Sequence, residues 1–240
     1  MAKKQNAQSE HIGEALTFSA TEAYKRLRTN IMFSLSNDKA CRIIGITSAM
    51  RHEGKSTTSV NLSYSFAEAG KRVLLIDCDM RLPNVNNLLS IPQTPGLSNF
   101  LIGDADVSAI VQKTDLQKNL VVIASGDISP RPPELLQSKR FASLLEAMAT
   151  KFDYIIIDLP PIDSVTDALI VSKNTDGMIM VTRRGYCDKK VLRDVMRQIR
   201  FHEVNLLGFV LTCADDGKSY YKSNYYKSNY YKADYKSDEA

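Results

Sequence analysis

The sequence has few cysteines and no long apolar run. Its four cysteines (Cys41, Cys78, Cys187 and Cys213) show no C-x-x-C spacing, which predicts small buried thiols in a reducing, cytosolic setting. No run approaches the roughly 18 apolar residues that a membrane span needs. The polar residues 1–14 contain no apolar core of the kind found in a secretion signal. We therefore expect membrane association, at the inner face of the cell membrane, only through a partner.

The sequence also lacks a concentration of charge of one sign. Its 31 lysines and arginines are scattered among 27 acidic residues, and the formal net charge is +4. Nucleic-acid binding proteins usually carry a basic stripe, so we expect no nucleic-acid partner. With 240 residues, 44% of them hydrophobic, the chain can bury the core of one α/β domain. We expect this domain over residues 15–214, between a flexible N-terminus (1–14) and a tail (215–240).

The most informative stretch of the sequence is Cys41 to Gly70. Arg42 to Thr47 is a short apolar run without helical period, which is typical of a buried parallel strand. Thr57 to Ala69 has a helical composition, and Gly70 is placed as a C-cap. A strand, a loop with Gly-Lys-Ser and a helix form the usual arrangement of a phosphate-binding site.

The loop between this strand and this helix is predicted to bind a nucleotide. Unpaired N–H groups at a helix start and the positive end of the helix dipole favour a polyphosphate. In this pattern Lys55 reaches the β- and γ-phosphates and the Ser56 hydroxyl binds Mg²⁺. The strict pattern G-x-x-x-x-G-K-[ST] is missed, because Ala49 stands where the first glycine is expected. The candidate nucleotide-binding residues are Met50, Arg51, His52, Glu53, Gly54, Lys55, Ser56 and Thr57.

Acidic residues follow two further apolar runs. Asp77 ends the predicted strand Arg72–Asp77, and Asp79 lies two residues beyond it. Asp158 ends the apolar part of a strand predicted over Tyr154–Pro161, the Walker B form. Ligands gather at the carboxyl ends of parallel strands, and carboxylates suit Mg²⁺. The predicted metal ligands are Ser56, Asp77 and Asp158. Asp163 and Asp167 precede the next helix, where a capping role and a catalytic role are equally compatible with the sequence.

The remaining elements continue an alternation of strands and helices. Further strands are predicted over Leu120–Ala124, Gly177–Thr182 and Asn205–Thr212, and helices over Glu134–Ala149, after a proline-rich connector (Gly126–Pro133), and Lys189–Phe201. This alternation predicts a mostly parallel sheet flanked by helices, in the manner of a P-loop NTPase.

An N-terminal helix is predicted over residues 15–36. Ser19 and Glu22 have capping-box spacing, and apolar residues recur at helical intervals. Glu22, Lys25 and Arg28 are three residues apart and share one stripe, either as a solvated face or as an oligomerisation motif.

The tail has a composition unlike the rest of the chain. From Asp215 onward it contains no Leu, Ile, Val or Phe, and Tyr-Tyr-Lys-Ser-Asn repeats every five residues. Such a segment cannot bury a core, so we expect disorder. Its tyrosines are candidate phosphorylation sites: Tyr220, Tyr221, Tyr225, Tyr226, Tyr230, Tyr231 and Tyr235.

Together, these motifs resemble the bacterial tyrosine kinases of capsule and exopolysaccharide synthesis, in their free-standing cytoplasmic form. The resemblance covers EAYKRLRTNI, EGKST, LLIDCDMRLP, SPRPPELL, YIIIDLPP and the tyrosine cluster. It implies that ATP and Mg²⁺ are bound, that the tail is phosphorylated between subunits of a ring-shaped homo-oligomer, and that a membrane-spanning activator recruits the kinase. A cognate tyrosine phosphatase is also expected. The implied catalytic residues are Lys55, Asp77, Asp79 and Asp158.

Three positions depart from the family pattern. Arg51-His52 replaces Pro-Gly in the loop, Lys25 replaces the first arginine of the oligomerisation motif, and Thr212 stands where relatives commonly carry Asn. Two alternatives remain: a partition or cell-division ATPase, although Met50 occupies the place of its signature lysine, and an inactive scaffold. For a kinase, either Asp77 or Asp79 would orient the tyrosine hydroxyl and accept its proton late, because a phenol and an Asp differ by about six pKa units.

Overall fold

A seven-stranded sheet runs through the centre of the protein in the computed structural model, which describes residues 12–35 and 38–214. The strands are β1 (Arg42–Ser48), β2 (Val73–Asp77), β3 (Val111–Lys113), β4 (Leu120–Ile123), β5 (Tyr154–Asp158), β6 (Gly177–Arg183) and β7 (Leu206–Thr212). Their order is β3-β4-β2-β5-β1-β6-β7. Every pairing in this sheet is parallel except the antiparallel pair of β3 and β4. The predicted mostly parallel α/β fold is therefore confirmed.

The register of the central strands determines where the polar residues meet. β2 and β5 are parallel neighbours, and Asp77 lies directly opposite Asp158. β1 runs beside β5, with Ile46 opposite Asp158, so the phosphate loop that follows β1 emerges at the same edge. The carboxyl edge of the sheet thus gathers the loop and both strand-end acids, as the sequence predicts.

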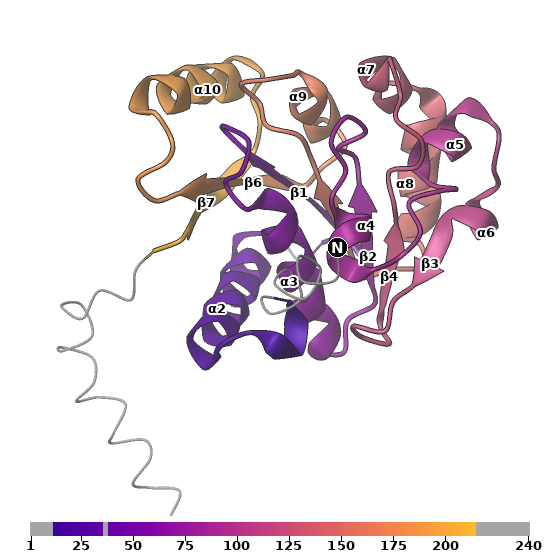
Figure 1. Ribbon diagram of the computed structural model, residues 1–240, viewed down its shortest axis with the longest axis horizontal. Helices are drawn as coiled ribbons and strands as arrows, with labels where there is room; N and C mark the ends of the chain where they lie inside the picture. The colour runs from indigo at the N-terminus through magenta and orange to yellow at the C-terminus, as the bar shows by residue number, and fades with distance from the viewer. Residues whose placement is uncertain (1–11, 36–37, 215–240) are drawn as a thin grey trace, which may run out of the picture.

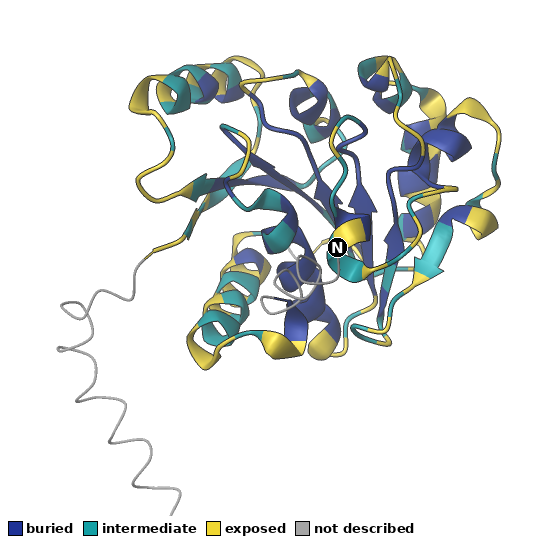
Figure 2. Cartoon of the chain, viewed as in Figure 1, coloured by how far each residue is buried: buried dark blue, intermediate teal, exposed yellow. Residues whose placement is uncertain are grey.

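Helices cover both faces of this sheet (Figure 1). α2 (Phe18–Ser34), α3 (Lys55–Glu68) and α4 (Val85–Leu89) pack with alternate strand residues on one face. α5 (Leu97–Ile102), α6 (Val107–Ile110), α7 (Pro132–Leu136), α8 (Lys139–Ala149), α9 (Asp167–Ser172) and α10 (Lys189–Phe201) pack on the other, and a short 3₁₀ turn, η1 (Gly13–Ala15), precedes α2. Figure 2 shows the central strands buried between these layers, whereas exposed residues lie on the outer sides of the helices, in loops and on the edge strand β7.

Several expectations about where helices start are wrong. The helix expected over Glu134–Ala149 is divided into α7 and α8, because Ser138 is extended and its side chain accepts a hydrogen bond from the Phe141 amide at 3.3 Å, which caps a new helix. The prolines expected in a connector instead begin α7.

The capping box expected at Ser19 is also wrong. Thr17 is the N-cap of α2, and its hydroxyl accepts the Ala20 amide at 3.3 Å.

The other boundaries lie within a few residues of expectation, and α10 has the bounds that the sequence predicts. The phosphate-loop helix begins earlier than Thr57, at Lys55. Gly70 follows the C-cap Ala69 in the left-handed region at φ 80°, where glycine is favoured. The short edge strand β3 was not predicted, because three residues are too few to show an alternation.

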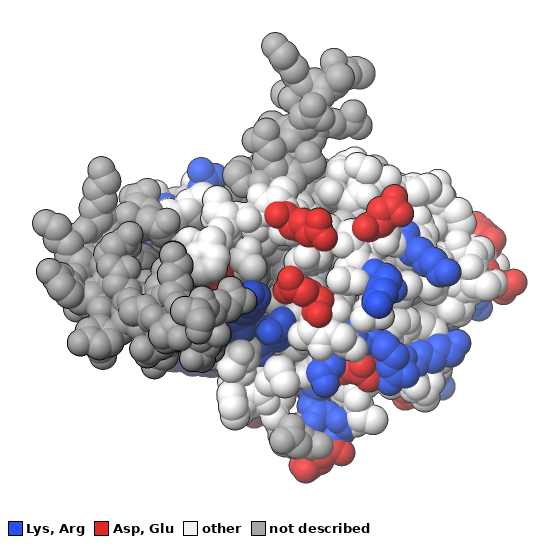
Figure 3. Space-filling view, turned by 90° about the horizontal axis from the view of Figure 1, so that it is seen from below, with Lys and Arg blue, Asp and Glu red and all other residues white. Residues whose placement is uncertain are grey.

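On the face shown in Figure 3, acidic and basic side chains of the described residues are interspersed. Within residues 12–35 and 38–214, no helix is long and apolar enough to cross a membrane.

Candidate active site

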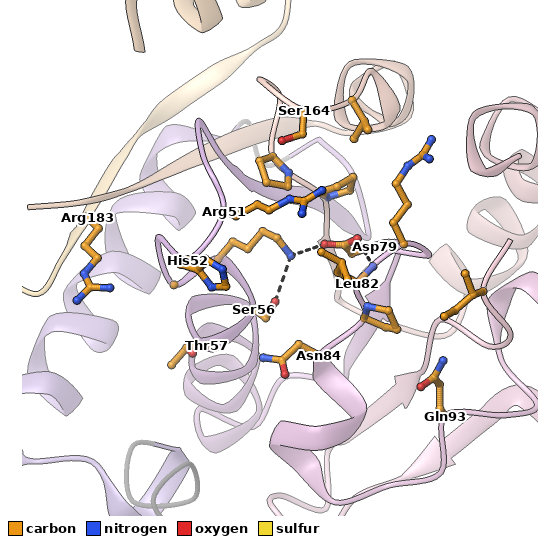
Figure 4. A pocket seen from close by; sticks show the side chains of 18 residues that line it. Arg51, His52, Ser56, Thr57, Asp79, Leu82, Asn84, Gln93, Ser164 and Arg183 are labelled. Atoms are coloured by element: carbon orange, nitrogen blue, oxygen red, sulfur yellow. Dashed lines mark hydrogen bonds and ion pairs between the residues drawn. The ribbon is translucent and has the colours of Figure 1, made fainter. Parts of the chain in front are cut away.

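A cleft of about 760 Å³ opens where the phosphate loop faces the end of β2 (Figure 4). The loop contributes Arg51, His52, Lys55 and Ser56, and the segment after β2 contributes Asp79. Gly54 is the N-cap of α3 at φ 93°, a conformation that glycine adopts at low cost. The first amides of α3 are thus presented to the cleft, as a phosphate site requires.

Glu53 shapes the loop from inside rather than lining the cleft. Its side chain is buried, and one carboxylate oxygen accepts the Met50 amide at 2.6 Å. The other oxygen accepts the Thr182 hydroxyl and the Arg183 amide of β6, both at 3.2 Å. These bonds attach the loop to the sheet, a role that the sequence did not distinguish from nucleotide contact.

Lys55 is the cation of a buried acidic cluster. Its ammonium nitrogen lies 2.8 Å from Asp79 Oδ2 and 3.5 Å from Asp158 Oδ2. Burial alone would lower the pKa of Lys55, but Asp158, Asp79 and Asp77 outweigh it and raise the pKa above its ordinary value. Lys55 is therefore fully charged at neutral pH.

Three carboxylates surround this single lysine, so their charge is not fully balanced. Burial, followed by the charge of Asp158, raises the pKa of Asp77 to about 7, although Lys55 opposes the shift. Burial likewise raises the pKa of Asp158. The site therefore favours an added proton or an added cation.

Asp77 and Asp79 have different surroundings, which the sequence could not show. Asp77 is fully buried, and its two oxygens accept backbone amides from Asp79 at 3.0 Å, Asn84 at 3.3 Å and Val85 at 3.2 Å. Asp79 lines the cleft, with one oxygen on Lys55 and the other accepting the Leu82 amide at 3.0 Å. Asp77 thus organises the loop after β2, while Asp79 faces the cleft.

The oxygens of Ser56 and Asp158 fit a Mg²⁺ site. Asp158 Oδ2 accepts the Ser56 hydroxyl at 2.6 Å, and its Oδ1 accepts the Ser59 hydroxyl at 2.9 Å. Hard oxygen donors beside a phosphate site suit Mg²⁺, which keeps several waters. Phosphate and water would supply the remaining ligands of such an ion.

The departures from the family pattern have structural counterparts. His52 has φ 62°, the left-handed region, where glycine would be unstrained. Thr212, at the end of β7, donates a hydrogen bond to the Glu53 carbonyl at 2.7 Å.

A second hollow of about 860 Å³ lies between α2 and β7 and adjoins the phosphate loop. His52, Gly54 and Thr57 line both this hollow and the cleft.

The charged stripe of α2 makes contacts within its own chain. Lys25 pairs with Glu22 at 3.0 Å. Arg28 donates to the Ser65 carbonyl and, at 3.2 Å, to the Ser65 hydroxyl, which joins α2 to α3. Assembly through these three residues stays a prediction. The seven tail tyrosines lie outside the described residues.

A family model described as an AAA domain matches residues 41–203. The chain is also 41% identical over 203 residues to "Tyrosine-protein kinase CpsD" of Streptococcus pneumoniae serotype 4, covering 84% of this chain and 88% of that protein. The chain belongs to the bacterial tyrosine kinases. The recognition that the sequence motifs suggested is confirmed.

Solved structures of bacterial tyrosine kinases share this architecture. The kinase domain of the Escherichia coli tyrosine kinase ETK has a TM-score of 0.76 at 31% identity, covering 84% of this chain and 80% of that one. The chimerical protein CapA2B2 has a TM-score of 0.75 at 35% identity, covering 79% and 83%. The septum site-determining protein MinD of Pyrococcus horikoshii, complexed with Mg-ADP, shares the fold alone at 24% identity, a TM-score of 0.61 and coverage of 74% and 72%. The likeness to kinases thus exceeds the likeness to the cell-division ATPase.

Proposed function

We propose that this bacterial tyrosine kinase transfers the γ-phosphoryl group of ATP to the tyrosines of its own C-terminal cluster, between subunits. The observation that carries the proposal is the pairing of Lys55 with Asp79 in the cleft. A cation for the phosphates and a carboxylate that lines the cleft, for the acceptor hydroxyl, lie side by side there. Phosphoryl transfer needs this combination of positioning and charge.

Each residue of the site has a role that follows from its surroundings. Asp79 orients the tyrosine hydroxyl and takes its proton late, as the oxygen–phosphorus bond forms and the bond to ADP breaks. Lys55 moves from the carboxylates to the phosphates. Asp77 holds the loop after β2, and Asp158 holds Ser56. Ser56 and Asp158, supported by Asp77, would hold Mg²⁺, which would supply further positive charge for the phosphates.

We infer the position of ATP from the two hollows that the phosphate loop lines. Lys55 and Asp79 face the cleft, so the terminal phosphate and the acceptor tyrosine belong there. The nucleoside then occupies the hollow between α2 and β7. β7 is parallel to β6 and ends at Thr212 beside the loop, so the tail begins at the catalytic edge.

The assembly and cellular role follow the family pattern. Glu22, Lys25 and Arg28 join neighbouring subunits in a ring, a membrane-spanning activator recruits the kinase to the membrane, and a tyrosine phosphatase reverses the modification. Phosphorylation adds about −1.5 to −2 charges per tyrosine, so a fully modified tail repels its neighbours and loosens the ring. This cycle regulates the synthesis and export of capsular or extracellular polysaccharide.

The test uses the full chain with Mg²⁺-ATP, with and without the cytoplasmic segment of a candidate activator, and maps phosphotyrosine by mass spectrometry. We expect modification at Tyr220 to Tyr235. A single Tyr231→Phe change should alter the total little, because the repeated tyrosines are equivalent. ATP hydrolysis without any phosphotyrosine would contradict the proposal and favour an ATPase switch.

A further inference from the structure

Asp167 is a buried carboxylate without an assigned role. It is the first residue of α9, yet the capping that its sequence position suggested is not the contact that its side chain makes. Asp167 is 0% exposed, its Oδ1 has no hydrogen-bond partner among the described residues, and its Oδ2 faces Arg81 Nε at 3.4 Å. A half-satisfied buried carboxylate costs folding free energy. Stability alone therefore does not explain it.

Its partner Arg81 belongs to the wall of the cleft. Arg81 lies two residues after Asp79, and its side chain is 36% exposed. Its bond to Asp167 uses Nε, and within the described part of the chain its terminal nitrogens have no partner. Arginine binds phosphate oxygens with two such nitrogens at once. Of the other cations that line the cleft, Lys55 is shared between Asp79 and Asp158, while Arg51 belongs to the phosphate loop and Arg183 to the end of β6.

We propose that Asp167 is a positioning residue that holds the Arg81 guanidinium in the cleft, where its free nitrogens bind the terminal phosphate of the nucleotide. The proposal rests on ATP being the substrate. Asp167 acts from a position 86 residues away in the sequence and touches no substrate itself. Ser164 and Val165, which precede α9, form part of the same wall, so the contact also ties α9 to the cleft.

Binding of nucleotides separates this role from a structural one. Calorimetry compares ADP with a non-hydrolysable ATP analogue for the wild type, Arg81→Gln, Asp167→Asn and the double variant. Removing a partner that orients a functional side chain typically costs about tenfold. We expect Arg81→Gln and Asp167→Asn each to weaken the binding of the ATP analogue by about that factor. The affinity for ADP should stay unchanged.

The double variant tests whether Asp167 works through Arg81. It should bind the analogue as Arg81→Gln does, because Asp167 has nothing left to position. If the two changes instead weaken the binding of the analogue additively in the double variant, the proposal is overturned. It is also overturned if the variants lose as much affinity for ADP as for the analogue.

Two further variants keep the test decisive. Asp163→Asn makes the same chemical change at an exposed position four residues earlier and should match the wild type. Arg81→Lys keeps the positive charge but lacks the Nε that bonds to Asp167, so it should bind the analogue as weakly as Arg81→Gln does. Wild-type affinity in Arg81→Lys would overturn the proposal, and this result does not depend on whether Asp167→Asn folds. A wild type that binds ATP but modifies no tyrosine would contradict the proposed function, while the comparison of the analogue with ADP would still decide the role of Asp167.

Discussion

Thr212 and Glu53 are 159 residues apart in the sequence, yet the Thr212 hydroxyl donates a hydrogen bond to the Glu53 carbonyl at 2.7 Å. This bond joins the end of β7 to the phosphate loop. The chain that leaves β7 is the tyrosine-rich tail, so the attachment point of the tail and the conformation of the loop are mechanically connected.

Replacing Thr212 by Val keeps the shape of the side chain and removes the hydroxyl. A typical hydrogen bond contributes about 0.5–1.5 kcal/mol, so we expect ATP to bind about two- to tenfold more weakly when the loop is less ordered. Calorimetric titration with ATP measures this effect. Thr212→Ser keeps the hydroxyl and should bind like the wild type, and an equal loss in both variants would argue against the bond.

Lys55→Met should abolish tail phosphorylation while the protein still folds. The ammonium group is the cation of the acidic cluster, and removing it leaves buried carboxylates unpaired at a cost of about 3 kcal/mol. We therefore expect a folded but less stable protein, measured by urea unfolding beside a phosphotyrosine assay. Lys118→Met, at an exposed lysine, is the matched control. Phosphotyrosine in the Lys55 variant, made in a host without another tyrosine kinase, would refute this role.

The raised pKa of Asp77 makes stability depend on pH when nucleotide is absent. The folded-state pKa is about 7 and the unfolded value is about 4, so the folded state binds more protons between these values. Stability should therefore fall as pH rises from about 4 to about 7 and level off above that range. Asp77→Asn should flatten this dependence in thermal unfolding scans between pH 5 and 8. The exposed Asp115→Asn should retain the wild-type slope.

His52→Gly should stabilise the protein, because His52 occupies the left-handed region at φ 62°. A residue with a side chain pays about 1 kcal/mol there, and we expect most of that energy to be recovered in urea unfolding. His52→Ala keeps the strain and serves as the control.

Restoring Pro-Gly at Arg51-His52 should also tighten ATP binding or speed transfer by a modest factor. Weaker nucleotide binding would show that the loop depends on these side chains.

Substitutions in the charged stripe of α2 should affect assembly and folding stability to different extents. Arg28→Ala removes the contacts with Ser65 and should lower stability by about 1 kcal/mol as well as weaken the ring. Glu22→Ala should weaken the ring only, and Lys25→Ala tests the remaining member. Light scattering at low salt measures assembly, and urea unfolding measures stability. A wild type that is strictly monomeric at high concentration would rule out the ring and leave a solvated helix face.

The sequence by itself determined most of the alternation of strands and helices along the chain and the edge of the sheet at which the site lies. Apolar runs followed by a Gly-Lys-Ser loop or by Asp indicate buried parallel strands whose carboxyl ends carry polar groups, because each strand and the loop after it are adjacent in the sequence. It also located the loop, Lys55, Asp77, Asp79 and Asp158. It misplaced the start of α2 and merged α7 with α8, because several residues nearby could cap a helix equally well.

Only the tertiary structure decided which of these side chains line the cleft and which are held by the backbone. Asp77 and Asp79 are two residues apart and chemically identical, and the fold of the loop after β2 gives one to backbone amides and the other to the cleft. Glu53 turns inward because β6 offers it an amide and a hydroxyl. Asp167 meets Arg81 because α9 packs against β1 and α7 at the edge of the sheet where β2 also ends. These roles depend on partners far apart in the chain, and only folding brings those partners within hydrogen-bonding distance.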